Sequence, residues 1–197
     1  MPKNTKFGAL YIVATPIGNL EDMSMRGLTT LGKVHLCAAE NTKNSKKLMK
    51  KYNLNTPLVS YHKYSEESKL NFLISTLKSG EDVGLISDAG TPLISDPGYL
   101  LVNKALEEGI RVVPIPGPSS LIAALSVSGM PLDKFIFYGF PPKKKKALET
   151  FLEILVMSEK TSIIFETKLR IIGFLEALAE VNPNRENFCS KGDDKVT

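Results

Sequence analysis

Residues 83–98 read Val-Gly-Leu-Ile-Ser-Asp-Ala-Gly-Thr-Pro-Leu-Ile-Ser-Asp-Pro-Gly, and this stretch does most to decide the fold. It starts with a short apolar run, Val83–Ser87, which has the length and composition of a buried strand. A long loop of small and polar residues follows, and Pro97-Gly98 then leads into a helix-compatible segment, Tyr99–Glu108, for which Asp96 is the expected N-cap. A strand, a polar loop and a helix in this order indicate one unit of an α/β fold.

The same order repeats along the first 130 residues, where short runs rich in valine and isoleucine alternate with longer amphipathic segments. The other expected strands are Ala9–Ala14, Val34–Ala38, Leu58–His62 and Val112–Ile115. The other expected helices are Met23–Leu31, Ser45–Tyr52, Glu66–Lys78 and Ser120–Ser128, and Asn53 and Gly109 stand where helices should stop. This alternation predicts a fold of the α/β class, with a mostly parallel sheet built from right-handed βαβ units.

A second α/β domain is expected to begin near residue 131, after the pattern of the first domain ends. Its expected elements are a strand at Phe135–Phe140, a helix at Ala147–Ser158, a strand at Thr161–Glu166 and a helix at Leu169–Val181. The predicted domains are therefore 1–130 and 131–183, with a polar tail at 184–197. Two strands are few for an independent sheet, so this domain either packs on something else or belongs to a chain that is short.

Composition excludes several classes of protein. The 197 residues carry a net charge of +4, which permits an anionic partner but does not demand one. Cys37 and Cys189 cannot build a disulfide framework, and no Cys/His cluster predicts a metal site. The start of the chain has no apolar core of a signal peptide, and no apolar run approaches the roughly 20 residues of a membrane span. We therefore expect a soluble, cytoplasmic protein without bound metal.

The loops that follow the strands are the first place to look for a site, because ligands of open parallel sheets bind beyond the carboxyl ends of the strands. The loop after Val83–Ser87 is the richest of them. Asp88 could accept hydrogen bonds from a ribose or an amine, Gly90 lets the backbone approach a ligand, and Thr91 offers a hydroxyl. The same residue types also make ordinary turns. No Gly-Lys-Ser/Thr and no GxGxxG follows a strand, which disfavours ATP and NAD.

Three of the loops that follow expected strands resemble the tetrapyrrole methylase superfamily: Thr15–Leu20, Ser87–Gly98 and Pro114–Ser120. Within it they are most similar to the ribosomal RNA small-subunit methyltransferase I group, and the resemblance extends from about Leu10 to Pro183. It implies that S-adenosylmethionine lies in a cleft between two α/β domains of a homodimer. It also implies that the methyl acceptor is the 2′-hydroxyl of a cytidine in 16S ribosomal RNA.

The resemblance assigns roles to individual residues. It implies that the cofactor is lined by Leu10, Asp88, Ala89, Gly90, Thr91, Pro92, Ser119 and Ser120. Pro16, Gly18 and Asn19 would face the reacting end. A ribose hydroxyl is a weak acid, so a general base would help, and the candidates at strand ends are Glu40, His62 and Glu166. Structural alternatives stay open: Ser119 and Ser120 also fit a helix cap, and Glu166 also fits an ion pair with Arg170 four residues on.

Two groups of lysines could contact RNA. Five of them recur at helical spacing and form one basic stripe: Lys43, Lys46, Lys47, Lys50 and Lys51. Phosphate binding and a solvated helix face both explain this stripe, and both also explain the run Lys143–Lys146. We expect Lys43, Lys46, Lys47 and Arg170 to contact the substrate.

The sequence departs from the family pattern at the acceptor side. Asn41 stands where the family has a second acidic residue after Glu40, and Lys63 stands where it has a glutamate after His62. Only the ends of the family's Glu-Ser-Pro-His-Arg motif remain, at Glu166 and Arg170. Two alternatives to an RNA ribose methyltransferase therefore stay open. One is a catalytically impaired relative that binds RNA or forms dimers, and the other is a methylase of a small tetrapyrrole.

Overall fold

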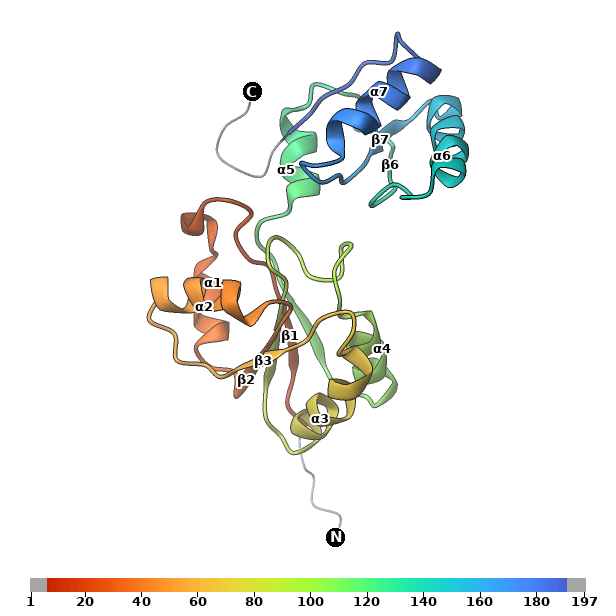
Figure 1. Ribbon diagram of the computed structural model, residues 1–197. Helices are drawn as coiled ribbons and strands as arrows, with labels where there is room; N and C mark the ends of the chain where they lie inside the picture. Colours follow the sequence, from red (N-terminus) through yellow and green to blue (C-terminus); the bar gives the residue numbers. More distant parts are fainter. Residues whose placement is uncertain (1–6, 191–197) are drawn as a thin grey trace. The chain divides into compact units, whose positions relative to one another are not determined.

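The computed structural model describes residues 7–190, which form two compact units, one ending at Ser120 and the other beginning at Leu121. The first unit alternates strands and helices along its whole length (Figure 1). Its elements are β1 (Leu10–Val13), η1 (Leu20–Asp22), α1 (Met25–Leu31), β2 (Leu36–Ala39), α2 (Thr42–Lys51), β3 (Leu58–Ser60), α3 (Glu66–Lys78), β4 (Val83–Ile86), α4 (Tyr99–Glu107) and β5 (Val112–Ile115). Helix α5 (Ser120–Val127) begins at the boundary residue.

The five strands form one parallel sheet in the order β3-β2-β4-β1-β5, which confirms the predicted α/β class. Strand β4 lies in the centre and pairs with both β2 and β1. Strand β5 lies at an edge and contains Pro114. The carbonyls of Arg111 and Ile115 accept hydrogen bonds from the Leu10 and Ala14 N–H groups, so the alternation along the strand turns the backbone of Pro114 to the open side.

Helices cover both faces of this sheet, as parallel strands require. One face packs against α3 and α4 through a core that includes Leu73, Leu77 and Leu101 (Figure 1). The other face packs against α1 and α2 through a core that includes Leu31 and Leu48. The first residue of β1, Leu10, belongs to the core beneath α3 and α4 and is fully buried.

Two of the predicted helix ends are confirmed. Asn53 follows α2 with a φ of 53°, and Gly109 follows α4 with a φ of 69°, the left-handed conformation that ends many helices. The predicted N-cap of α4 is wrong. Helix α4 begins at Tyr99, as the predicted segment does, but its N-cap is Gly98, with a φ of 134° and no side-chain cap. Asp96 is held in the preceding loop instead.

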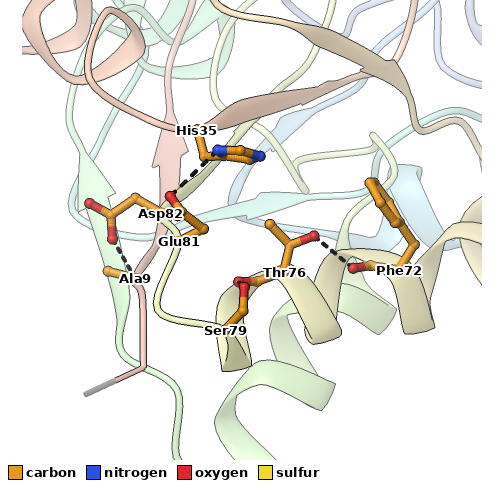
Figure 2. A network of polar contacts seen from close by, with 7 residues as sticks. All are labelled: Ala9, His35, Phe72, Thr76, Ser79, Glu81 and Asp82. Atoms are coloured by element: carbon orange, nitrogen blue, oxygen red, sulfur yellow. Dashed lines mark hydrogen bonds and ion pairs between the residues drawn. The ribbon is translucent and has the colours of Figure 1, made fainter. Parts of the chain in front are cut away.

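Polar contacts fix the amino ends of the strands, at the edge opposite to the loops that carry the candidate site. Figure 2 shows them where β1, β2 and β4 begin. The Ala9 N–H donates to the Asp82 carboxylate at 2.7 Å, and His35 Nδ1 lies 3.4 Å from the Glu81 carboxylate. Helix α3 ends beside them, where the Ser79 hydroxyl donates to the carbonyl of Thr76. These contacts hold the strand starts in register.

The second unit contains α5 from Leu121 onward, then a βαβ unit and one more helix. Its further elements are β6 (Phe135–Phe137), α6 (Lys145–Met157), β7 (Thr161–Ile163) and α7 (Ile171–Val181). The two strands are parallel, and the core lies between α6 and α7, with Leu152, Leu155, Phe174 and Leu178 buried. The predicted tail at 184–197 lies partly outside the described residues, and its described part contains no helix or strand. The boundary between the two units is defined by packing alone. It does not test whether 1–130 and 131–183 are functional domains, which stays a prediction.

Candidate active site

The loops that follow β1 and β4 are joined to each other at the carboxyl ends of the strands. The Thr15 N–H donates to the Gly90 carbonyl and the Gly90 N–H donates to the Thr15 carbonyl, both at 2.9 Å. The Thr15 side chain is buried, and its hydroxyl donates to the carbonyl of Ser87 at 3.2 Å. Two loops that are more than 70 residues apart in the sequence therefore form one continuous backbone surface.

The loop that follows β5 joins the same surface. The Thr91 hydroxyl donates to the Pro118 carbonyl at 3.2 Å. At Gly90 a Cβ atom would lie 3.4 Å from the Ile17 side chain and 3.9 Å from the Pro118 carbonyl. Gly90 is thus the point where the loops of β1, β4 and β5 converge. The structure brings together the sequence-predicted cofactor residues of the β4 and β5 loops at this point.

The predicted cofactor residues differ in how far they are exposed to solvent. Asp88 and Ala89 are exposed, Thr91, Ser119 and Ser120 are partly buried, and Gly90 and Pro92 are buried. Leu10 lies at the amino end of β1, with no exposed surface, so the structure gives it a place in the core rather than on this surface. We therefore leave Leu10 out of the proposed cofactor set.

Two neighbouring elements hold Asp88, one through its backbone N–H and the other through its carboxylate. The Asp88 N–H donates to Glu40 Oε2 at 3.3 Å, and Glu40 follows the adjacent strand β2. The Asn44 side-chain amide, on the first turns of α2, donates to Asp88 Oδ2 at 2.9 Å. Glu40, a predicted base, thus lies next to the predicted cofactor residue Asp88.

A third carboxylate, Asp96, shares this region. It is partly buried, and burial raises its pKa to about 6. The negative charges of Glu40 and Asp88 act in the same direction, while a hydrogen bond from Ser87 opposes them. The three acidic side chains therefore concentrate negative potential beside the exposed residues Asp88 and Ala89.

Asp96→Asn is expected to raise the free energy of unfolding near pH 7.5 and to change it little near pH 4. The pKa of Asp96 in the folded chain, about 6, lies above its ordinary value of 3.8, so the folded chain holds a proton that the unfolded chain releases between these values. Stability is therefore lost as the pH rises from about 4 through about 6. Urea unfolding of both proteins at the two pH values measures this. A difference in stability that is the same at both pH values would contradict the raised pKa.

The β4 loop holds an unusual backbone conformation between Asp88 and α4. Leu93 and Ser95 have positive φ angles of 72° and 69°, which side chains larger than glycine adopt rarely. The loop ends at Gly98, whose N–H donates to Glu66 Oε1 at 2.8 Å. Glu66 begins α3 and also faces the buried hydroxyl of Tyr61, whose pKa is raised by burial and then by the Glu66 charge. Glu66 therefore fixes the end of this loop.

His62 follows β3 at the far side of the same edge. The His62 backbone N–H donates to the Ser65 hydroxyl at 2.9 Å, and that hydroxyl donates to the His62 carbonyl at 3.1 Å. The ring lies edge-on to Tyr64, with centroids 6.2 Å apart. His62 Nδ1 is shielded from solvent and has no hydrogen-bond partner within residues 7–190. Ser65 thus fixes the turn that carries the candidate base.

The residues predicted to face the reacting end have local roles in the loop after β1. Asn19 is the N-cap of η1, where its side-chain oxygen accepts a hydrogen bond from the Glu21 N–H at 3.0 Å. Gly18 is exposed and Pro16 is buried. The cap engages the side-chain oxygen of Asn19.

Glu166 and Arg170 lie in the second unit and contact each other. Arg170 Nη2 lies 3.2 Å from Glu166 Oε2, in a geometry that is an ion pair but not a hydrogen bond. The same guanidinium donates to the carbonyls of Pro141 and Pro142 at 3.3 and 3.2 Å. The alternative predicted from their spacing, an ion pair within the fold, is therefore confirmed.

The predicted basic stripe lies on α2. All five of its lysines are exposed, while Leu48 on the opposite side of the helix is buried. No acidic side chain lies within 4 Å of these lysines in the part of the chain that the structure describes. Their charge is therefore available to an anionic partner.

Sequence reasoning missed Asn44 and Glu66, which hold Asp88 and Gly98. Both contacts join residues that are distant in the sequence, and neither side chain belongs to a motif. One signal was available for Asn44, because it is an uncharged residue among the lysines at the start of a helix that follows a site loop.

No helix in residues 7–190 is both long and apolar enough to cross a membrane. The same residues contain no group of three or more His, Cys, Asp or Glu side chains that could hold a metal ion.

Comparison with known proteins gives the relatives of this chain. It is similar to "Ribosomal RNA small subunit methyltransferase I" of Haemophilus influenzae, with 47% identity over 88% of the chain and 62% of that protein. It is likewise similar to the proteins of the same name from Pseudomonas aeruginosa, at 49% identity over 88% of the chain and 61% of that protein, and Bacillus subtilis, at 45% identity over 91% and 61%. The chain thus spans about three fifths of the length of the curated relatives that it matches.

The fold has a counterpart among solved structures. The uroporphyrin-III-C-methyltransferase from Thermus thermophilus matches with a TM-score of 0.51 and 21% identity, over 67% of this chain and 60% of that one. A family model described as tetrapyrrole (corrin/porphyrin) methylases matches residues 9–189. Nearly the whole described chain, with the joined loops around Gly90, falls inside that match. The chain belongs to the tetrapyrrole (corrin/porphyrin) methylase family.

Proposed function

We propose that this protein is an S-adenosylmethionine-dependent methyltransferase that modifies the 2′-hydroxyl of a cytidine in 16S ribosomal RNA. The observation that carries the proposal is the exposed carboxylate of Asp88 at the convergence of the β1, β4 and β5 loops. This convergence lies at the carboxyl ends of the strands, where open α/β sheets bind their ligands. Family membership and the names of the relatives support the type of reaction and the class of substrate.

The residues at this convergence suit the chemical groups of S-adenosylmethionine. When bound, the cofactor supplies a methyl group on a positively charged sulfur. An exposed carboxylate at Asp88 would accept hydrogen bonds from ribose hydroxyls or from the amino group. The exposed residue Ala89 adds a backbone N–H donor, and Thr91, Ser119 and Ser120 border the same surface. The nearby carboxylates of Glu40 and Asp96 would favour a cation at this position.

The acceptor hydroxyl needs alignment and the removal of a proton. Glu40 is the stronger candidate base, because its carboxylate contacts the Asp88 backbone and therefore lies beside the proposed cofactor position. His62 follows the next strand and has a shielded nitrogen without a partner. We assign Glu166 and Arg170 a structural role, since each engages the other and Arg170 also holds two backbone carbonyls.

The exposed lysines of α2 supply the contact to RNA phosphates. Lys43 stands at the start of the helix, at the same end as Asn44 and Asp88, and Lys46 and Lys47 follow one turn later. A substrate strand bound along this helix would reach the loops at the carboxyl edge. Phosphate contacts position a nucleic acid without reading its sequence, so the choice of nucleotide must come from other residues.

Calorimetry with S-adenosylmethionine tests the proposal first, followed by transfer of a labelled methyl group to 16S RNA in small ribosomal subunits. Binding with transfer to a ribose oxygen is the expected result. Absence of binding would sink the proposal. Binding of RNA without transfer would favour the impaired relative, for which the departures at Asn41 and Lys63 argue. Transfer to a small tetrapyrrole would favour the alternative of a small-tetrapyrrole methylase.

That the protein forms a homodimer and that it lies in the cytoplasm stay predictions.

Replacing Lys43, Lys46 and Lys47 together with glutamine should weaken RNA binding and flatten its salt dependence. Each lost phosphate contact lowers the slope of log K against log salt by about 0.7–0.9, so three contacts would lower it by about 2–3. Fluorescence anisotropy with a labelled RNA fragment at several salt concentrations measures the slope. The same replacement at Lys143, Lys144 and Lys145 removes equal charge from the second exposed lysine group and tests its contact with RNA separately. An unchanged slope for the α2 variant would refute RNA binding by this helix.

A further inference from the structure

We propose that Asn44 is a positioning residue, whose amide holds the Asp88 carboxylate in the orientation in which it binds the cofactor. The proposal rests on the function proposed above and assigns a role to a residue outside the family motifs. Its basis is the 2.9 Å hydrogen bond from Asn44 Nδ2 to Asp88 Oδ2, which links residues 44 positions apart. Asn44 would act through Asp88 without touching the reacting groups.

Asn44 stands on a firmly anchored helix. The N-cap of α2 is Asn41, whose side-chain oxygen accepts a hydrogen bond from the Lys43 N–H at 3.0 Å. The Ser45 hydroxyl donates to the Asn41 carbonyl at 3.1 Å, and Ser45, Leu48 and Met49 are buried. A capped helix with a buried face has little freedom to move, so the position of the Asn44 amide is fixed.

The surroundings of Asp88 make such a donor necessary. Glu40 Oε2 accepts the Asp88 N–H at 3.3 Å, and Asp96 senses the charges of both carboxylates. The negative charges of Glu40 and Asp96 repel that of Asp88, so an unpaired Asp88 side chain would turn away toward solvent. The Glu40 contact fixes the backbone of Asp88, and the Asn44 amide fixes its side chain. Together these two contacts define where the free lone pairs of Asp88 point.

A neutral donor suits this place better than the lysines around it. A lysine would neutralise the negative potential that favours the cationic cofactor, whereas an amide donates a hydrogen bond and leaves the charge of Asp88 in place. Lys43 and Lys47, on the same helix, form no ion pair with Asp88 within residues 7–190. Helix α2 thereby supplies cations to the RNA and a neutral donor to the cofactor loop.

The test compares cofactor binding and turnover in the full chain and its variants. Asn44→Ala is expected to raise the Kd and KM for S-adenosylmethionine about tenfold, the effect of losing a hydrogen bond to a charged group, while kcat changes less than threefold. Asn55→Ala is the matched control, because Asn55 is an exposed asparagine in the loop after α2. Its Kd should equal that of the unchanged protein.

A second variant gives a readout that a purely structural role would not change. Asn44→Asp places a carboxyl group of nearly the same shape beside Asp88. At about pH 8 the two charges repel and binding should be weaker than in Asn44→Ala, whereas toward about pH 5 one shared proton restores the donor. The ratio of the Kd of Asn44→Asp to that of the unchanged protein should therefore fall at least fivefold over this range. Asn55→Asp should show a constant ratio.

The outcomes separate the two proposals. If the unchanged protein binds the cofactor and Asn44→Ala binds as well as Asn55→Ala does, the positioning role is overturned and the proposed function stands. A ratio for Asn44→Asp that is constant with pH overturns it equally, even if Asn44→Ala proves too unstable to study. If the unchanged protein does not bind S-adenosylmethionine, the proposed function fails, and the positioning role fails with it.

Discussion

Gly98→Ala should lower the free energy of unfolding by about 2–5 kcal/mol and abolish cofactor binding, the largest effect we expect from a single methyl group in this chain. Gly98 has a φ of 134°, a conformation that L-residues rarely adopt. A Cβ atom here would lie 2.8 Å from Leu85 Cδ2 and 3.2 Å from Leu93 Cγ. The Gly98 N–H also donates to Glu66, so a shift that relieves the clash would break that hydrogen bond. The loop after β4 would then lose the hydrogen bond that fixes its last residue.

Urea unfolding and calorimetry with S-adenosylmethionine measure the two effects of Gly98→Ala. Gly109→Ala is the matched control, because Gly109 also has a positive φ, 69°, but a Cβ atom there meets nothing within 4 Å. It should cost about 1 kcal/mol, the strain of the backbone alone, and leave cofactor binding unchanged. Equal destabilisation by the two substitutions would contradict the close packing described for Gly98.

Leu10→Ala should lower the free energy of unfolding by about 2–5 kcal/mol and leave the cofactor affinity of the folded protein unchanged. Leu10 has no exposed surface and packs in the core beneath α3 and α4, near Leu73, Leu77 and Leu101. It pairs with the first residues of β4 and β5, at the end of the sheet away from the loops. Removing its side chain leaves a cavity in the core and does not alter the surface around Asp88.

Urea unfolding and calorimetry under native conditions again measure both quantities for Leu10→Ala. Leu106→Ala serves as the control, because Leu106 lies on α4 of the same unit with 58% of its surface exposed. Its loss should change stability by less than about 0.5 kcal/mol. A marked fall in cofactor affinity without a fall in stability would contradict this prediction and indicate that Leu10 contributes to cofactor binding.

The sequence predicts the elements of the fold well where periodicity is strong. The helix at Glu66–Lys78 and the strand at Val112–Ile115 agree with the structure residue for residue. The strand order could not be predicted in the same way, because the pairing of β4 between β2 and β1 depends on contacts far apart in the chain. The N-cap of α4 was wrong because Asp96 and Gly98 both suit the start of a helix, and only the backbone φ distinguishes them.

For the candidate site too, local sequence patterns predict some residues, and contacts between distant parts of the chain determine the others. The stretch Ser87–Gly98 identified the loop, and the i to i+4 spacing identified the ion pair between Glu166 and Arg170. The pKa of Asp96 is raised first by burial and then by the charge of Glu40, which is distant in the sequence and comes close only because β2 and β4 pair in the sheet. Asn44 and Glu66 likewise act across the sheet, so a reading along the chain finds them only after the strand order is known.

Pro114 has a consequence for how copies of this chain can associate. A strand at the edge of a sheet offers unpaired N–H and C=O groups to any passing strand, which is a common route to aggregation and to dimers. Pro114 turns toward the open side of β5 and has no N–H to offer there. Growth of the five-stranded sheet by strand addition is therefore blocked at β5, and a dimer of this unit must form through its helices, its loops or the short edge strand β3.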